Sequence, residues 1–317
     1  MDRLASKRNL WFAISLIVII PGLVSLLFSG LKLGIDFTGG TLWELQFNQP
    51  VETEAVKQVL SANGFDNTVV QNTTDGDAEN IVLIRMRELK EGSPEKQAIE
   101  AGFQADPRLG SFVERQIETV GSSVGNEIRN RAVFAVLLAS VGILLYIAWA
   151  FRNTQNPLLY GTCAIVAMLH DVLVVVGIFS ILGVLFDVEV DALFVTALLT
   201  VIGFSVHDTI VVFDRIRENL ARRAAPNFEE VVNYSLAQTV VRSLNTSLTV
   251  VFTLLALYLF GGSTTREFVL ALLIGVISGT YSSIFNASQL LVAWENGDIQ
   301  RLFGRVRRQR ALPVPSQ

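Results

Sequence analysis

The chain has 317 residues, of which 51% are hydrophobic, and its mean hydropathy is +0.47. These values exclude an ordinary soluble domain and indicate a membrane protein. The formal net charge is −4, and a single cysteine, Cys163, excludes an intrachain disulfide, a thiol pair and a cysteine-based metal site.

Six stretches of the chain are long and apolar enough to cross a membrane, which takes about 20 mostly apolar residues. The first stretch is longer than the apolar core of a secretory signal peptide, so it is predicted to be a retained anchor. The third and fourth stretches each contain a single Asp. The predicted spans are 9–31, 132–151, 158–186, 194–213, 243–262 and 268–294.

Basic residues are distributed unevenly among the connections between the spans. Short loops on the cytoplasmic side of a membrane collect Lys and Arg. The connection "VLFDVEVD" has no basic residue and "GGSTTRE" has one, so these two are expected on the opposite side. The pattern predicts both termini in the cytoplasm and residues 32–125 outside it. The cytoplasmic set is Arg3, Lys7, Arg8, Arg152, Arg215, Arg217, Arg222, Arg223, Arg301, Arg305, Arg307, Arg308 and Arg310.

The stretch between the first two spans has the composition of an acidic soluble domain, with 16 Asp and Glu against 10 Lys and Arg between Lys32 and Arg131. Strand-like segments at 41–47, 68–73, 80–86 and 111–120 surround two helical segments. The first helix is expected to have a Thr cap at Thr53 and a Gly stop, and the second opens with Ser-Pro. The order β-α-β-β-α-β predicts a ferredoxin-like α+β domain, periplasmic by the charge pattern, at 32–125.

The remaining five spans predict an α-helical membrane bundle over 126–294, preceded by the N-terminus and first span at 1–31. A longer cytoplasmic insert at 214–241 contains "NFEEVVNYSLAQTVV", which predicts an amphipathic helix lying on the membrane surface. The tail at 295–317 is basic and is expected to interact with membrane lipid rather than with nucleic acid.

Two His-Asp pairs interrupt apolar spans: His170-Asp171 in the third and His207-Asp208 in the fourth. An Asp inside a span costs about 2.5–3.5 kcal/mol, so each carboxylate needs a partner or a proton. Consecutive helical residues point about 100° apart, so His207 and Asp208 are each expected to find a partner on another helix. All four residues are candidates for proton coupling; the alternative is that the histidines only form hydrogen bonds between helices.

Polar faces on the fifth and sixth spans offer such partners. Arg242 opens the fifth span and is the expected partner of Asp208, and Gly275-x-x-x-Gly279 in the sixth span predicts close helix packing. Three alternatives remain open: a structural ion pair between Asp208 and Arg242, Arg242 as an anchor that follows the positive-inside rule, and ordinary membrane-helix packing by the polar faces. The faces comprise Asn245, Thr246, Thr249 and Thr253, and Gly275, Ser278, Gly279, Ser282, Asn286 and Gln289.

The sequence contains no Gly-rich phosphate loop, no zinc-spaced set of His and Cys and no nucleophile elbow. "GIDFTGG" has adjacent glycines but lacks the Lys-Ser/Thr of a phosphate-binding loop. Enzymatic activity, a metal centre and ATP-driven work are therefore not expected. A proton-driven exporter of small molecules or lipids, or a non-transporting scaffold, fits these observations.

Four segments carry a more specific signal: "LGIDFTGGTLWELQF" after the first span, "HDV" in the third, "VHDTIVVFDRIREN" in the fourth and "RSLNTSLTVVFTLLALYLFGG" in the fifth. In this order they resemble the SecD/SecF family of the bacterial Sec protein-export machinery, over essentially the whole chain. The resemblance implies a multi-pass protein of the bacterial inner membrane, related to the resistance-nodulation-division transporters, that pairs with SecD and associates with the SecYEG channel.

The resemblance also implies an activity and its residues. With SecD, and with the proton gradient rather than a cofactor as energy source, the family promotes late-stage translocation of an unfolded preprotein through SecYEG into the periplasm. The family's membrane Asp and Arg correspond to Asp208 and Arg242, and its usual Asn before that Asp is replaced by His207 here. Its signature corresponds to Asp36, Phe37, Thr38, Gly39 and Gly40.

The expected mechanism joins these residues. Protonation of Asp208 weakens its attraction to Arg242, the helices shift, and the domain at 36–125 moves through a hinge at Gly39 and Gly40.

Overall fold

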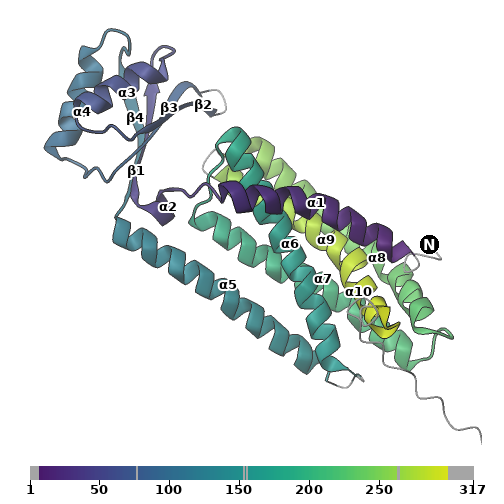
Figure 1. The fold of residues 1–317 in the computed structure, drawn as a ribbon. Helices are drawn as coiled ribbons and strands as arrows, with labels where there is room; N and C mark the ends of the chain where they lie inside the picture. The colour runs from purple at the N-terminus through teal and green to yellow at the C-terminus, as the bar shows by residue number, and fades with distance from the viewer. Residues whose placement is uncertain (1–6, 76–77, 153, 155, 263–264, 299–317) are drawn as a thin grey trace, which may run out of the picture.

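The computed structural model describes residues 7–298, apart from 76–77, 153, 155 and 263–264. These residues form a long helical bundle with a small sheet domain at one end, which we call the junction end (Figure 1). Most of the predicted basic tail, together with Arg3, lies outside the described residues.

Six helical segments of the described chain are long and apolar enough to span a membrane, which confirms the predicted architecture. The last segment is interrupted by a π-helical turn, Ser283–Ala287. The segments are α1 (Arg8–Ser29), α5 (Ser122–Ala150), α6 (Pro157–Phe186), α7 (Ala192–Ala221), α8 (Phe228–Phe260), and α9 (Arg266–Ser282) continued by α10 (Ser288–Glu295).

The prediction of a surface helix within the 214–241 insert is wrong. Helix α7 continues to Ala221 and α8 runs unbroken for 33 residues, so a short turn joins two long helices. Val232 and Leu236 of α8 are buried in one cluster with Ile216 of α7, because the apolar face of this segment packs on its neighbour instead of on the membrane surface. At about 1.5 Å per residue, α8 is roughly 50 Å long.

The sheet domain has the predicted β-α-β-β-α-β order. Its elements are β1 (Gly40–Phe47), α3 (Thr53–Ala62), β2 (Val69–Asp75), β3 (Ala78–Met86), α4 (Pro94–Ala105) and β4 (Phe112–Val120). The strand order β2-β3-β1-β4, with every neighbouring pair antiparallel, is that of a ferredoxin-like sheet. Thr53 is not a cap, since it is the first residue of α3 and no side chain caps that helix, whereas Ser93 caps α4 as its position predicts.

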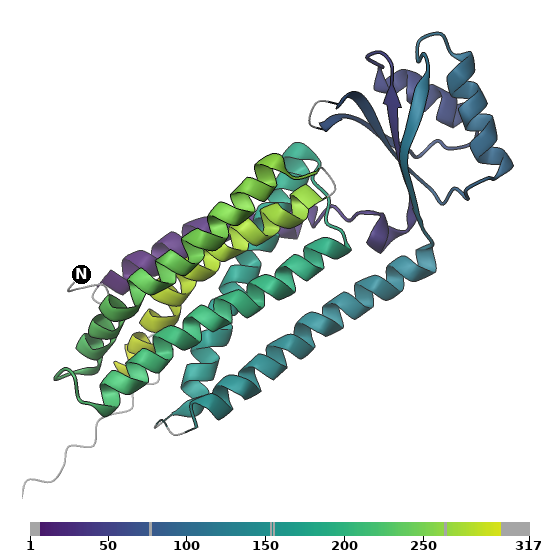
Figure 2. The ribbon, with the colours of Figure 1, turned by 180° about the vertical axis from the view of Figure 1, so that it is seen from behind.

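Alternation along β1 separates the two faces of the sheet. Trp43, Leu45 and Phe47 are buried in the core under α3 and α4, which cover the face turned away from the bundle (Figures 1 and 2). Leu42 and Glu44 point the other way and line a cavity beside the bundle. The uncovered face of the sheet therefore looks toward the membrane helices.

Within the bundle, α6, α7 and α9 form the interior and α1 packs along α6. A Cβ added to Gly22 would lie 2.7 Å from Gly177 Cα, so α1 and α6 approach through their backbones. The outer faces of α1, α5 and α8 expose large apolar side chains such as Phe28, Phe134 and Phe260. Such faces suit contact with lipid or with further membrane helices.

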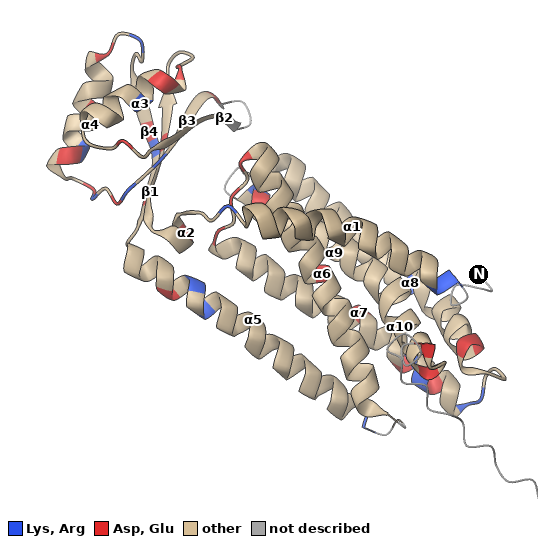
Figure 3. Ribbon diagram, viewed as in Figure 1, with Lys and Arg blue, Asp and Glu red and all other residues tan. Residues whose placement is uncertain are grey.

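Charged residues gather on the sheet domain and near the ends of the helices (Figure 3). Arg242 lies near the middle of α8 and is exposed, whereas Asp171 and Asp208 are buried in the interior of the bundle, on α6 and α7. These two carboxylates define the candidate site.

Candidate functional site

Asp171 is fully buried and is surrounded by serine hydroxyls from two other helices. Ser205 Oγ of α7 donates to Oδ2 at 2.5 Å, Ser282 Oγ of α9 donates to Oδ2 at 2.6 Å, and Ser278 Oγ donates to Oδ1 at 2.7 Å. Ser278 and Ser282 are four residues apart and so share one face of α9. Hydrogen bonds of this kind are what allows a carboxylate to be buried.

The two His-Asp pairs lie in different surroundings. His170 Nδ1 is 3.0 Å from Asp171 Oδ1, so the 100° spacing of consecutive helical residues does not prevent a contact between a His and the next Asp. The His170 ring stacks on Tyr281 of α9 with ring centroids 6.2 Å apart, and its Nε2 is buried without a hydrogen-bond partner among the described residues. His207, in contrast, is exposed on the surface of the chain.

Asp208 has far fewer partners. Ser243 Oγ of α8 donates to its Oδ1 at 2.6 Å, which agrees with the expectation of a partner on another helix. Its Oδ2 is buried and accepts no hydrogen bond from the described part of the protein, and the residue is only 8% exposed. A carboxylate oxygen without a donor in a membrane interior is costly.

The expected ion pair between Asp208 and Arg242 does not form. Within residues 7–298 as described, no contact of 4 Å or less joins the two charges, and the Arg242 side chain is exposed. Its neighbour Ser243 takes the position toward α7, and consecutive residues of a helix point about 100° apart, so Arg242 faces outward.

The threonine face predicted to continue from Arg242 into the interior is also turned outward. Thr246, Thr249 and Thr253 are exposed, and each hydroxyl donates to the backbone carbonyl four residues earlier. A threonine in a membrane helix can satisfy itself in this way. The polar face of the sixth span, by contrast, is buried: Gly275, Ser278, Gly279, Ser282, Asn286 and Gln289.

A π-helical turn connects the surroundings of the two carboxylates. Ser283, its first residue, lies 2.9 Å from Thr209 Oγ1, next to Asp208, and donates at 3.1 Å to the backbone carbonyl of Ser205, whose side chain holds Asp171. Because Ser282 also bonds Asp171, two consecutive residues both face the interior. Turns of this kind are often found at functional sites.

Ser205, Thr209, Ser243 and Ser283 were not singled out by sequence reasoning. Single serines and threonines are common in membrane helices, and nothing in their spacing marks them. Only the packing of α6, α7, α8 and α9 against one another brings the hydroxyls of Ser205 and Ser243 to the two carboxylates and joins Thr209 to Ser283.

The glycines of the sixth span lie against α7. A Cβ on Gly275 would overlap the Val201 side chain, and one on Gly279 would lie 3.1 Å from the Cβ of Ser205. Gly279 therefore sets how close Ser205 comes to Asp171.

The signature segment lies at the junction, where the short helix α2 (Ile35–Thr38) leads into β1. Asp36 Oδ2 accepts a hydrogen bond of 2.8 Å from the backbone N–H of Ala192, the first residue of α7. Phe37 is buried against the bundle, and Thr38 donates to the carbonyl of Gly34 at 3.0 Å. Gly39 has φ +75° and its added Cβ would lie 2.6 Å from Ser122 Cα, so no larger side chain fits there.

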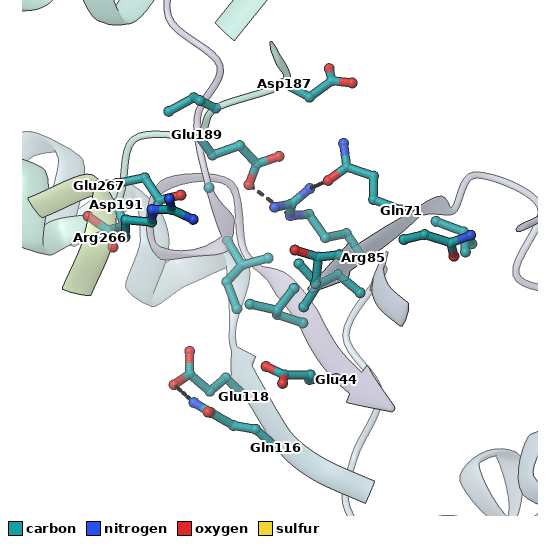
Figure 4. A pocket seen from close by; sticks show the side chains of 18 of the residues that line it. Glu44, Gln71, Arg85, Gln116, Glu118, Asp187, Glu189, Asp191, Arg266 and Glu267 are labelled. Carbon is teal, nitrogen blue, oxygen red and sulfur yellow. Dashed lines mark hydrogen bonds and ion pairs between the residues drawn. The ribbon is translucent and has the colours of Figure 1, made fainter. Parts of the chain in front are cut away.

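A cavity of about 680 Å³ lies between the open face of the sheet and the junction end of the bundle (Figure 4). Arg85 of β3 crosses it, with Nε 2.8 Å from Glu189 Oε2 on the α6–α7 connection. Burial raises the pKa of the Glu189 carboxyl. The hydrogen bond from Lys32, 2.6 Å away, lowers the pKa of Asp187 on the same connection. The described residues contain no group of three or more His, Cys, Asp or Glu arranged for a metal ion.

Comparisons with known proteins agree with this architecture. Residues 104–297 match the family model "Protein export membrane protein SecD/SecF, C-terminal", and residues 24–51 match "SecD/SecF GG Motif", which includes Gly39 and Gly40. The chain is 58% identical to protein translocase subunit SecF of Thermobaculum terrenum over 310 residues, covering 96% of this chain and 97% of the relative. It is 45% identical to the SecF subunit of Anaerolinea thermophila over 306 residues, covering 96% and 98%.

A solved structure shows the same fold. The crystal structure of SecDF from Thermus thermophilus, a translocon-associated membrane protein, matches with a TM-score of 0.79 at 35% identity, covering 92% of this chain and 38% of that chain. The protein translocase subunit SecDF of Bacillus subtilis is 36% identical over 301 residues and likewise is matched over 38% of its length. The chain therefore belongs to the SecD/SecF family of protein-export membrane proteins, in its SecF branch.

Proposed function

We propose that this SecF-type subunit, paired with SecD in the inner membrane, uses the proton gradient to promote the late stage of preprotein translocation through SecYEG into the periplasm. Both termini lie in the cytoplasm and the sheet domain lies in the periplasm, as the positive-inside pattern supports. Two of the comparison proteins, those named SecDF, support the pairing with SecD.

The observation that carries the proposal is the state of Asp208. Its carboxylate is buried in a membrane helix with one donor, Ser243, and one oxygen without a partner among the described residues. Taking up a proton removes the uncompensated charge, so this residue can respond to the gradient. Asp171, with His170 beside it, has its charge compensated by serine hydroxyls and holds α6, α7 and α9 together.

The energy available is sufficient for a conformational change. One charge that crosses the membrane releases about 2.3 kcal/mol per 100 mV, and a few kcal/mol shifts a two-state equilibrium by roughly 100-fold. We infer that protonation of Asp208 changes the packing of α7 against α8, and that this movement reaches the sheet domain through the segment at Gly39 and Gly40.

The test is preprotein translocation into sealed vesicles that contain SecD, with and without a proton-gradient uncoupler. We expect Asp208→Asn to lack the uncoupler-sensitive part of export that the wild type shows. Asp214→Asn is the matched control, because Asp214 lies on the same helix but is 55% exposed and pairs with Arg217. Wild-type uncoupler sensitivity in the Asp208→Asn variant would contradict the proposal.

A further inference from the structure

Asp36 contacts a helix that is distant in the sequence. Its carboxylate accepts from the backbone N–H of Ala192 at 2.8 Å, across a separation of 156 residues. Asp191, the N-cap of α7, accepts from Phe194 N at 2.8 Å. The first N–H groups of a helix have no partner within the helix, and its N-terminus favours negative charge. Two carboxylates therefore accept from the first N–H groups of α7: Asp191 lies directly before the helix, and Asp36 lies on the segment that leads into the sheet domain.

The segment that carries Asp36 is fixed to the bundle by several further contacts. Gly34 N donates to Val190 O at 2.8 Å and Val190 N donates to Lys32 O at 2.9 Å, directly before α7. Phe37 is 5% exposed and belongs to a buried cluster with Phe179 and Phe194. The segment therefore cannot slide along α7 without breaking these contacts.

On its other side, the same segment is tied to the sheet domain and to α5. It continues through Gly39 directly into β1, a central strand of the sheet. An added Cβ on Gly125 of α5 would lie 3.0 Å from Gly39 N. Contacts this tight at Gly39 make the segment a firm connection, which transmits movement rather than absorbing it.

Helix α7 also carries Asp208. Asp208 follows Ala192 by sixteen residues, which corresponds to roughly 24 Å of continuous helix that moves as a stiff body. A change of charge at Asp208 that displaces α7 therefore displaces Ala192 as well.

We propose that Asp36 is a positioning residue that couples α7 to the sheet domain through its hydrogen bond to Ala192. Movement of α7 on protonation of Asp208 is passed through this bond to α2 and β1. The inference rests on the proposed function, because it assumes that the charge of Asp208 moves α7.

Other polar links across the junction are of a different kind. Arg85–Glu189 and Lys32–Asp187 join the domain and the linker to the α6–α7 connection, not to the backbone of α7 itself. Asp187 is 63% exposed, and ion pairs at such sites contribute little. Asp187 therefore provides a matched control for Asp36.

The experiment measures a distance between spin labels in the complex with SecD, reconstituted in lipid nanodiscs on a cysteine-free background that includes Cys163→Ser. The labels are placed through Ser61→Cys on α3 and Val184→Cys on α6, both exposed positions. Asp208→Asn imitates the protonated state. We expect it to shift this distance when Asp36 is present, and Asp36→Ala to remove at least half of the shift.

A second variant removes the same hydrogen bond by changing its donor, Ala192, instead of its acceptor. Ala192→Pro deletes the donor N–H, and proline is well tolerated at the first position of a helix. Ala192→Pro is expected to reduce the shift in distance as much as Asp36→Ala does, and the double variant is expected to reduce it no further. Both variants are expected to keep the wild-type melting temperature and to assemble with SecD. Asp187→Ala is expected to leave the shift unchanged.

Two results overturn the inference, and they are distinguishable. If the shift survives in both Asp36→Ala and Ala192→Pro, the coupling takes another path while the proposed function stands. If Asp208→Asn produces no shift even with Asp36 and Ala192 intact, the proton-driven movement itself fails, and the inference fails with it.

Discussion

Asp171 and Asp208 each follow a histidine, on neighbouring helices, yet Asp171 accepts several hydrogen bonds and Asp208 accepts few. Among the described residues, Asp171 has three serine donors and His170, whereas Asp208 has Ser243 alone. Burial alone therefore does not identify a proton-responsive group. The difference in donors separates a carboxylate that organises the bundle from one whose charge can change.

The largest effect is expected when the organising carboxylate is removed. Asp171→Ala removes the acceptor of Ser205 and Ser278, whereas Ser282 keeps the Gly279 carbonyl at 3.2 Å. Unsatisfied buried groups cost about 1–3 kcal/mol each, so the loss of stability is expected to be about 2 kcal/mol or more. Thermal unfolding in detergent measures this loss of stability and compares it with that of Asp208→Ala, which removes the acceptor of Ser243. Equal destabilisation by both variants would remove the distinction between the two residues.

The next effect concerns the serines themselves. Ser243→Ala removes the one donor that Asp208 has within the described part of the chain, whereas Ser278→Ala leaves Asp171 with Ser205, Ser282 and His170. A hydrogen bond to a charged group contributes about 1.5–3 kcal/mol. We expect Ser243→Ala to change uncoupler-sensitive export several-fold and Ser278→Ala to change it little. Vesicle translocation assays compare the two, and a reversed order would show that Asp171 is the responsive group.

A change in helix packing can disturb the surroundings of Asp171 and leave those of Asp208 intact. Gly279→Ala places a Cβ 3.1 Å from the Cβ of Ser205, which pushes the Ser205 hydroxyl away from Asp171 and is expected to cost about 1–3 kcal/mol. Gly203→Ala on α7 is the control, because its added Cβ meets nothing within 4 Å. Melting temperatures of the two variants test this, and a neutral Gly279→Ala would contradict the tight contact.

The smallest effect belongs to a carboxylate at the surface of the sheet domain. Hydrogen bonds from Arg108 lower the pKa of Asp106 from its ordinary value of 3.8 to about 2. A lowered folded-state pKa stabilises the fold above the unfolded value, and that contribution is lost as the pH falls through about 2. The melting-temperature difference between wild type and Asp106→Asn should therefore be small at pH 6 and vanish near pH 2. A melting-temperature difference that grows as the pH falls would show that the pKa of Asp106 is raised by folding, contrary to this prediction.

Hydropathy was enough to predict the six spans, and strand alternation was enough for the ferredoxin-like domain, because both signals are local. The direction of side chains within the bundle was not predictable in the same way. Thr246 and Arg242 were expected inside and lie outside, since a helical face is defined only relative to its neighbours. The segment at 228–241 has an apolar face that fits a membrane surface as well as a helix, and only packing against α7 decides between them.

Among the expected site residues, the structure brings His170 and Asp171 together and leaves His207 and Arg242 apart from Asp208. The signature at Asp36 was recognised from its letters, whereas its partner Ala192 has a side chain with no chemistry to suggest a role. Contacts made by backbone N–H groups leave no trace in a sequence.

The length of α8 has a consequence for motion on both sides of the membrane. The hydrocarbon core is about 30 Å thick, so roughly 20 Å of this helix, with the end of α7, extends beyond it into the headgroup region and the water. The projecting part includes the α7–α8 turn at the end opposite the sheet domain. Any tilt of the two helices about the membrane midplane therefore moves this projection and the sheet domain together, in opposite directions.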